Sequence, residues 1–319
     1  MNTQAKYRDR LPQQSGQMFL TDGGMETTLI YHDGIDLPCF AAFTLLKTPE
    51  GVQRVRDYYA RYAAMAQKAG LGFVLESPTW RANADWGAKL GYSRAALADA
   101  NRHGIAVMAE LRTQFETARS PMVISGVIGP RGDGYDPSRI MSADEAQAYH
   151  AEQIATYRGT AADLVSAFTM NYVNEVVGIA RAAQAAAMPV VISFTVETDG
   201  RLPTGETLAE AIAQVDGATG SAPVYYMINC AHPTHFRDAL ACGEAWVKRI
   251  GGLRANASKR SHAELEQATT LDAGDPVVFG REHADLRRML PHVTVFGGCC
   301  GTDHRHVEQI MFACEPVAA

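Results

Sequence analysis

Short runs of apolar residues alternate with longer amphipathic segments along most of the chain. Eight of these runs are nearly continuous and several are rich in β-branched residues, which is typical of strands buried on both faces of a parallel sheet. We predict strands at 18–21, 72–75, 122–127, 163–167, 190–196, 224–229, 250–255 and 293–296. The run at 250–255 is the least typical, because it contains two glycines and an arginine.

The segments between these runs carry the start and stop signals of helices. Thr48 and Pro49 precede apolar residues at helical spacing and Gly70 follows them, which predicts a helix between these points. Ser142 and Glu145 have the spacing of a capping box at the start of another helix. Strands that alternate with helices favour the α/β class and a (β/α)8 TIM-type barrel, with a doubly wound open sheet as the alternative.

Length and composition limit the organisation and the partners of the protein. The 319 residues have no linker-like stretch, so we expect a flexible leader at 1–17 and one catalytic domain at 18–319. The net charge of −6 argues against nucleic acid and anionic membranes. No apolar run is long enough to span a bilayer. We therefore predict a cytoplasmic protein. Its six cysteines are not expected to form a disulfide framework, and any that cluster are better explained by metal binding or catalysis.

Three cysteines follow predicted strands in a pattern that indicates a catalytic metal site. Cys299 and Cys300 lie in the glycine-rich sequence 297–301, and Cys230 follows Asn229 at the end of the sixth strand. In a barrel the sixth and eighth strands end at the same face, so three thiolates would converge on one Zn²⁺. A vacant fourth position would hold a substrate thiol as its thiolate, ready to attack an electron-poor methyl group.

Two other functions remain open at this point. The loop 297–301 could bind phosphate in a metal-free barrel lyase or isomerase, and a non-catalytic protein could hold zinc with four ligands. We expect ordinary packing or surface roles for the remaining cysteines and for the histidines near the cysteine motifs. These residues are Cys39, Cys242, Cys314, His232, His235, His304 and His306.

Taken together, these motifs resemble the homocysteine S-methyltransferase family, zinc barrels that include betaine– and S-methylmethionine–homocysteine methyltransferases. The similarity runs from the sequence 22–27 (DGGMET) to 297–301 (GGCCG). Intermediate landmarks are 126–130 (GVIGP), 193–195 (SFT) and 228–230 (INC). The resemblance implies a (β/α)8 fold, zinc on the three cysteines, and methyl transfer to homocysteine or a related thiol or selenol, as in methionine biosynthesis.

The resemblance also places the acceptor over the barrel mouth, near Asp22, Gly23 and Gly24. A carboxylate such as Asp22 could pair with a substrate ammonium there. Family members usually carry a glutamate at the end of the fourth strand for the homocysteine amino group, whereas this chain has Phe168. Either Glu76, at the end of the second strand, supplies the missing charge, or the acceptor is a different thiol.

The resemblance implies a cationic methyl donor, a sulfonium or quaternary ammonium compound and most simply one like S-methylmethionine. Aromatic faces would attract such a cation. The candidates are Trp80, Trp86, Tyr31 and Phe168, and Thr79, Asn229 and Asn256 are expected near the same pocket. Whether zinc survives oxidation of the adjacent Cys299 and Cys300 stays open. Whether the chain assembles into a homo-oligomer stays open.

Overall fold

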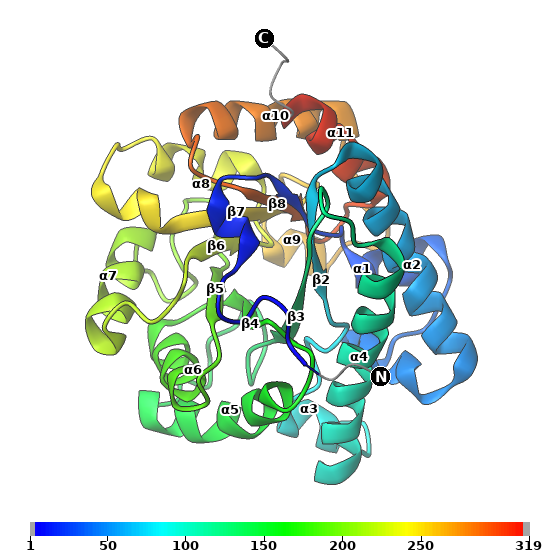
Figure 1. Cartoon of the computed structure of the whole chain (residues 1–319). Coiled ribbons are helices and arrows are strands. Elements are labelled where there is room, and N and C mark those ends of the chain that lie inside the picture. Colours follow the sequence, from blue (N-terminus) through cyan, green and yellow to red (C-terminus); the bar gives the residue numbers. More distant parts are fainter. Residues whose placement is uncertain (1–3, 315–319) are drawn as a thin grey trace.

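The computed structural model describes residues 4–314, and all its strands form one closed parallel barrel (Figure 1). The strands are adjacent in sequence order and the last pairs with the first. Their bounds are β1 Phe19–Leu20, β2 Gly72–Glu76, β3 Met122–Ile128, β4 Leu164–Met170, β5 Val190–Phe194, β6 Tyr226–Asn229, β7 Ile250–Ala255 and β8 Val295–Gly298. The predicted (β/α)8 barrel is therefore confirmed, and the open sheet is not formed.

Helices surround the barrel and connect its strands. Their bounds are α1 Met25–Thr27, α2 Pro49–Ala69, α3 Ala84–Lys89, α4 Arg94–Phe115, α5 Ala143–Arg158, α6 Val173–Ala185, α7 Leu208–Thr219, α8 Pro233–Leu240, α9 His262–Glu266, α10 Pro276–Met289 and α11 His304–Cys314. The start and stop signals act as predicted. The Thr48 side chain accepts a hydrogen bond from the Gly51 backbone, and Gly70 ends α2 in the left-handed conformation. Ser142 and Glu145 form the expected capping box.

Two apolar layers hold the barrel together. The inner layer fills the barrel with buried side chains from most of the strands, among them Phe19, Val74, Val191, Met227 and Val295. The outer layer lies between the strands and the helices and is much larger. Strands that bury both faces explain why the sequence showed continuous apolar runs instead of alternation.

The segment before β1 differs from the loose leader that the sequence suggested, within the part that the structure describes. The backbone N–H groups of Lys6 and Tyr7 both donate to Asp163 at 2.7 Å. The Arg8 side chain donates to backbone carbonyls, and Leu11 and Gln13 are buried. The segment closes the amino-terminal end of the barrel, where its polar backbone finds partners that hydropathy alone does not reveal. Residues 1–3 lie outside the described range, and the single-domain boundary at 18 remains a prediction.

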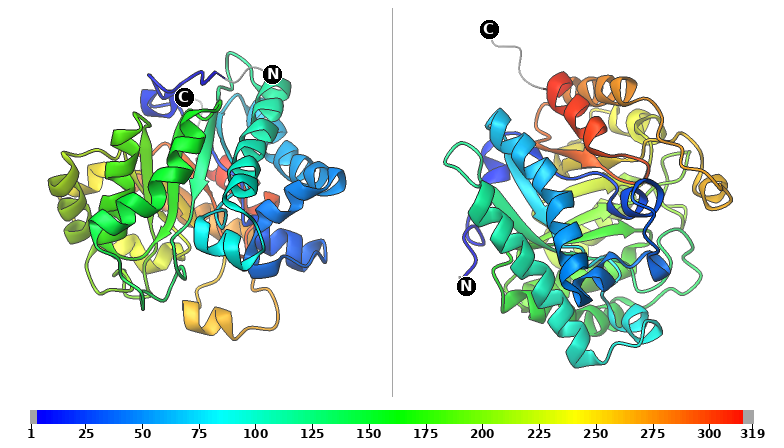
Figure 2. Two further views of the ribbon diagram at one scale, coloured as in Figure 1. Left: turned by 90° about the horizontal axis from the view of Figure 1, so that it is seen from below. Right: turned by 90° about the vertical axis from the view of Figure 1, so that its right-hand side faces the viewer.

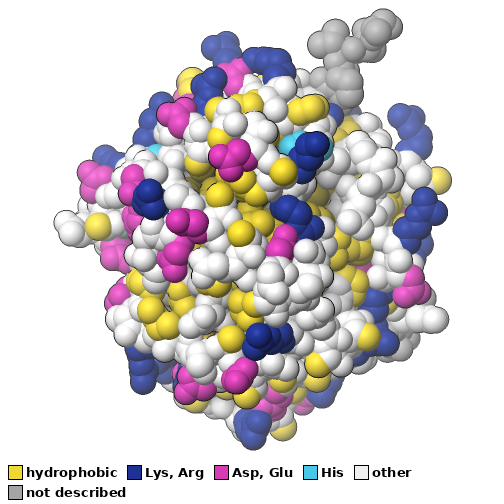
Figure 3. Space-filling view, turned by 90° about the vertical axis from the view of Figure 1, so that its left-hand side faces the viewer, with side chains coloured by type: hydrophobic (Ala, Val, Ile, Leu, Met, Phe, Trp, Pro, Cys, Tyr) yellow, Lys and Arg dark blue, Asp and Glu magenta, His cyan; other side chains and the backbone are white. Residues whose placement is uncertain are grey.

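The opposite end of the barrel is open to a cavity and bordered by a long loop. Figure 2 shows the amino-terminal segment at one end and the β7–α10 connection, which contains α9, projecting at the other. On the side of the molecule shown in Figure 3, basic and acidic side chains are interspersed and do not gather into a patch of one sign. Among residues 4–314, no helix combines the length and the apolarity that a bilayer span needs.

Candidate metal and substrate site

A cavity of about 470 Å³ lies at the carboxyl ends of the strands, where active sites of (β/α)8 barrels are found. Six loops that follow strands contribute to its lining, and β4 contributes through residues of the strand itself. All residues proposed from the sequence as metal or substrate ligands line it: Asp22, Gly23, Gly24, Glu76, Trp80, Phe168, Asn229, Cys230, Cys299 and Cys300. Tyr31 and Asn256 line it too, whereas Thr79 and Trp86 do not. The topology of the barrel thus brings together residues far apart in the sequence.

The sulfur atoms of Cys230, Cys299 and Cys300 lie within 4.8 Å of one another. Cys230 directly follows β6 and adopts a left-handed backbone conformation, with φ of 54°, which turns the chain sharply at the strand end. Cys299 and Cys300 follow Gly298 at the end of β8. The structure joins Cys230 to Cys299 as a disulfide and leaves Cys300 as a free thiol. This disulfide links the ends of β6 and β8 and does not join the adjacent Cys299 and Cys300.

The three cysteines fit a tetrahedral zinc ion when they are reduced. Zn–S bonds of about 2.3 Å place the sulfurs of such a site about 3.8 Å apart, so only small movements separate this cluster from that geometry. Within residues 4–314 the cluster contains no fourth His, Cys, Asp or Glu ligand, which leaves one coordination position for a substrate. Burial raises the pKa of the Cys300 thiol to about 11. A metal cation would oppose this effect by stabilising the thiolate.

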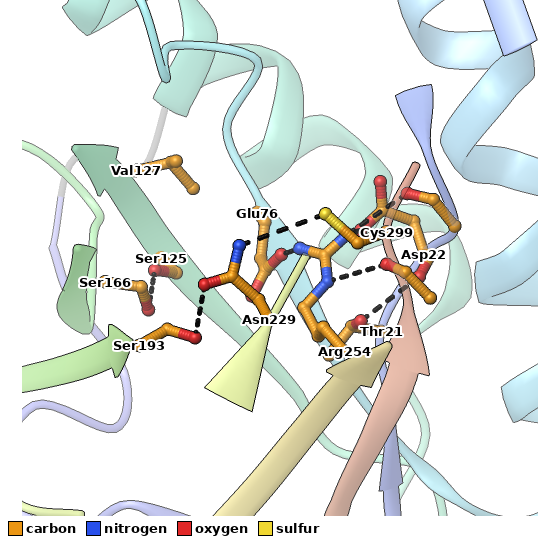
Figure 4. A network of polar contacts seen from close by, with 12 residues as sticks. Thr21, Asp22, Glu76, Ser125, Val127, Ser166, Ser193, Asn229, Arg254 and Cys299 are labelled. Atoms are coloured by element: carbon orange, nitrogen blue, oxygen red, sulfur yellow. Dashed lines mark hydrogen bonds and ion pairs between the residues drawn. The ribbon is translucent and has the colours of Figure 1, made fainter. Parts of the chain in front are cut away.

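Asn229 orients the cysteines from the end of β6 (Figure 4). Its Oδ1 accepts hydrogen bonds from the Thr169 backbone N–H at 2.9 Å and the Ser193 hydroxyl at 2.7 Å. Its Nδ2 donates to the Thr169 hydroxyl at 3.0 Å and to the Cys299 sulfur at 3.9 Å. The Thr169 hydroxyl in turn donates to the Cys230 sulfur at 3.9 Å. Donors aimed at sulfur stabilise negative charge on it.

The carbonyl oxygen of Cys230 is held from the opposite side by the β7–α10 connection. Asn256 Nδ2 donates to it at 3.0 Å, and His262 Nε2 lies 2.6 Å away. The His262 ring stacks on Tyr135 with centroids 4.0 Å apart, and the Tyr135 side chain interacts electrostatically with Cys300. These residues fix the cysteine positions. Sequence reasoning expected Asn256 here and missed Tyr135, which lies on the loop after β3, and His262, which begins the short helix α9.

Arg254 is the main site residue that the sequence analysis missed. It lies on β7, and its side chain enters the barrel mouth, where it forms ion pairs with Asp22 at 2.8 Å and with Glu76. Figure 4 shows its guanidinium between the two carboxylates. A signal was present, because a charged side chain in a run that predicts a buried strand requires a buried partner. Glu76 is therefore paired with Arg254 through its Oε2, so Arg254 already balances the charge that our first hypothesis assigned to a substrate ammonium.

Three of the four aromatic residues proposed for the methyl donor already contact cations of the protein itself. The Phe168 ring lies 5.1 Å from the Arg254 guanidinium carbon, and Trp80 and Trp86 lie 4.1 Å and 4.0 Å from that of Arg81. These contacts are favourable cation–π interactions. Their rings are therefore less available to a cationic methyl donor than the sequence suggested. Tyr31, which lines the cavity and is exposed, has no such partner among the described residues.

Glu26 is a carboxylate of the cavity that sequence reasoning did not select. It lines the cavity from α1, and among the described residues it forms no ion pair. Burial raises its pKa to about 7, and nearby Asp22 acts in the same direction. Burial also raises the pKa of Asp22, while Arg254 and the Tyr58 hydroxyl oppose that effect.

The geometry gives little support to the two alternative functions. In the loop 297–301, the backbone N–H groups of Gly298, Cys299 and Gly301 donate to acceptors within the protein, so the loop offers few amides to a phosphate. His232 lies against Glu282 at 3.2 Å and outside the cysteine cluster, as expected. His235, His304 and His306 also lie outside it.

Comparison with known proteins agrees with this geometry. Residues 19–314 match the family model described as homocysteine S-methyltransferase. The homocysteine methyltransferase MmuM from Escherichia coli has a similar structure. Its metallated form has a TM-score of 0.72 at 18% identity, over 93% of this chain and 96% of that one. Its oxidized form has a TM-score of 0.71 at 19% identity, over 92% and 95%. The family match covers most of the barrel and all three site cysteines, and the chain therefore belongs to the homocysteine S-methyltransferase family.

Proposed function

We propose that this methyltransferase moves a methyl group from a cationic donor to a thiol held on a zinc ion by Cys230, Cys299 and Cys300. The convergence of three sulfurs at the mouth of the barrel, with one ligand position left over, carries the proposal. Homocysteine is the acceptor named by the family, and a selenol would react in the same way. A zinc ion bound there would act as a Lewis acid that keeps the acceptor sulfur deprotonated at neutral pH.

The protein's own residues position the reacting groups. Asn229 and Thr169 orient the cysteine sulfurs, and Asn256 and His262 hold the Cys230 backbone. The acceptor sulfur then forms a bond to the methyl carbon while the bond from that carbon to the donor breaks. The electron pair of the broken bond leaves with the donor, and the acceptor's thiol proton goes to solvent. The enclosed cavity supplies the alignment that such an in-line transfer needs.

The donor we propose is a sulfonium such as S-methylmethionine, with a quaternary ammonium compound as the alternative. The cavity contains the unpaired carboxylate Glu26, which would attract a cation. Tyr31 offers an aromatic face on which no cation of the described residues lies. A neutral or anionic donor would find less favourable contacts on this side of the cavity.

The proposal is tested with protein purified under reducing, anaerobic conditions. We expect one zinc ion per chain by elemental analysis and a methylated thiol by mass spectrometry after incubation with S-methylmethionine and homocysteine. Cys299→Ser should lose the zinc and reduce transfer to the uncatalysed level. Cys242→Ser, which changes an exposed cysteine outside the site, is the matched control and should retain both. Zinc retained in full by Cys299→Ser would contradict the assignment of the ligands.

A further inference from the structure

Asp22 has no free oxygen for a substrate cation. Its Oδ1 accepts from Arg254 at 2.8 Å and its Oδ2 accepts from the Tyr58 hydroxyl at 3.0 Å. The side chain is 3% exposed, so solvent contributes little to its surroundings. A substrate ammonium could reach this carboxylate only by displacing one of two buried donors.

The guanidinium of Arg254 is fixed at this position by more than its ion pairs. Its Nε donates to the Gly298 carbonyl at 3.0 Å, and its Nη2 donates to the Gly23 carbonyl at 3.1 Å as well as to Asp22. Its Nη1 faces Glu76. Acceptors on the strand ends β1, β2 and β8 therefore surround one cation, and moving that cation would leave several buried acceptors unpaired.

Phe168 closes the same region from β4. Its ring lies 5.1 Å from the guanidinium carbon and is 5% exposed. The part of the cavity between Asp22, Glu76 and Phe168 therefore already contains a positive charge, held by two carboxylates and one aromatic face. A second cation at this depth would meet the guanidinium at short range, while both carboxylates are already paired with donors of the protein.

We propose that Arg254 takes the place of a substrate ammonium, and that the acceptor is a thiol with no amino group near its sulfur. This inference rests on the proposed function, because it concerns the acceptor of the same reaction. Glu26 is a carboxylate of the cavity lining without an ion-pair partner among the described residues, so an acceptor ammonium bound there is the competing arrangement. Two thiols that differ only in the ammonium group, together with a variant of Glu26, distinguish these two arrangements.

Homocysteine and 4-mercaptobutyrate are the matched probes, because they share the carbon chain, the thiol and the carboxylate and differ only in the ammonium group. The kcat/KM of the reduced, zinc-loaded protein is measured for each with the same donor. We expect 4-mercaptobutyrate to be preferred by about tenfold or more, from the loss of a charged hydrogen bond and the repulsion by Arg254. A tenfold preference for homocysteine would overturn the inference and uphold the proposed function. Methylation of neither thiol would overturn both.

Two charge-balanced double variants locate the selectivity. Glu76→Gln with Arg254→Met removes one charge of each sign and frees Asp22, so the preference should shift toward homocysteine by about tenfold to a hundredfold. Asp216→Asn with Arg249→Met removes a comparable pair, joined at 2.8 Å outside the cavity, and should leave the preference unchanged. An unchanged preference in a folded, zinc-loaded first variant would contradict the role of Arg254. If that variant does not fold, the wild-type comparison still decides.

Glu26→Gln examines the competing arrangement. If Arg254 excludes an acceptor ammonium, this variant should keep the wild-type order of the two thiols, even where its use of the cationic donor falls. A loss of homocysteine use alone, with 4-mercaptobutyrate unaffected, would place the acceptor ammonium at Glu26 and overturn the inference.

Discussion

Among residues 4–314, two buried guanidinium–carboxylate clusters lie at opposite ends of the barrel and serve different purposes. At the amino-terminal end, Asp163 accepts from the backbone of Lys6 and Tyr7 on one oxygen, and from Arg112 and the backbone of Ile124 on the other. Three of its four partners are thus main-chain groups. The amino-terminal segment covers the cluster, so it joins that segment to β3, β4 and α4.

At the carboxyl end, the cluster contains one more carboxylate. One guanidinium, Arg254, serves two carboxylates, Asp22 and Glu76, and all three line the cavity. This cluster borders the space in which substrates would bind, so its arrangement affects binding as well as folding. Residue types alone do not decide the role of a buried ion pair. The partners and the space around it decide whether it joins elements or selects ligands.

The largest expected effect is on stability at the amino-terminal end. Arg112→Met leaves the Asp163 carboxylate buried without a cation, although three backbone N–H groups remain. We expect a loss of about 3 kcal/mol in the free energy of unfolding, measured by urea denaturation. Zinc content and the preference between thiols should not change, because the cluster lies at the end of the barrel opposite the cavity.

Arg254→Met is the corresponding change at the carboxyl end. Water in the cavity can reach the vacated space and hydrate the carboxylates, so we expect a smaller stability loss of about 1–2 kcal/mol together with altered thiol preference. The comparison would fail if Arg112→Met changed the thiol preference as strongly as Arg254→Met, or if both variants lost the same stability.

Most of the fold could be predicted because its signals are local. Parallel strands buried on both faces produce continuous apolar runs, and Thr48 and Gly70 mark helix ends through hydrogen bonds and backbone conformations that depend on neighbouring residues. The packing of the amino-terminal segment could not be predicted, since residues 4–17 are mostly polar. Their main partner, Asp163, lies over 140 residues away along the chain.

The site was predictable where a short motif carries the chemistry. The cysteines followed from the glycine-rich sequence after β8 and from Asn229 and Cys230 after β6, once a barrel was assumed. The charge balance was not predictable, because Arg254, Asp22 and Glu76 belong to three strand ends whose proximity only the closed barrel creates. Sequence reasoning selected Glu76 and Phe168 separately and missed Arg254, which contacts both.

The buried Glu26 at the carboxyl end should make stability depend on pH. Burial raises the pKa of Glu26 from 4.5 to about 7. A carboxyl with a raised pKa stabilises the fold while protonated, so its contribution is complete below about pH 4.5 and is lost as pH rises through 7. Glu26→Gln cannot ionise and should keep this contribution. Relative to wild type, we expect the variant to gain about 1–2 kcal/mol between pH 5 and pH 8, after allowance for solvent screening.

Thermal or urea unfolding across this pH range measures the effect. Glu266→Gln, on the exposed rim of the same cavity, is the matched control and should show no such gain. An equal gain in both variants would assign the effect to the net charge of the protein and not to the burial of Glu26.

The smallest expected effect concerns a single hydroxyl at the amino-terminal end. The Tyr7 hydroxyl donates to Glu116 at 2.6 Å, and Glu116 also accepts from the Lys6 ammonium and from the Met122 backbone at 3.0 Å. Tyr7→Phe removes one of three donors and leaves the carboxylate partly solvated, so the unfolding free energy should fall by only about 1 kcal/mol. Zinc content and thiol preference should remain at wild-type values, because this end contributes to stability alone. A change in thiol preference in Tyr7→Phe would show that the two ends are coupled through the barrel, and the separation of roles argued from their charge clusters would then be wrong.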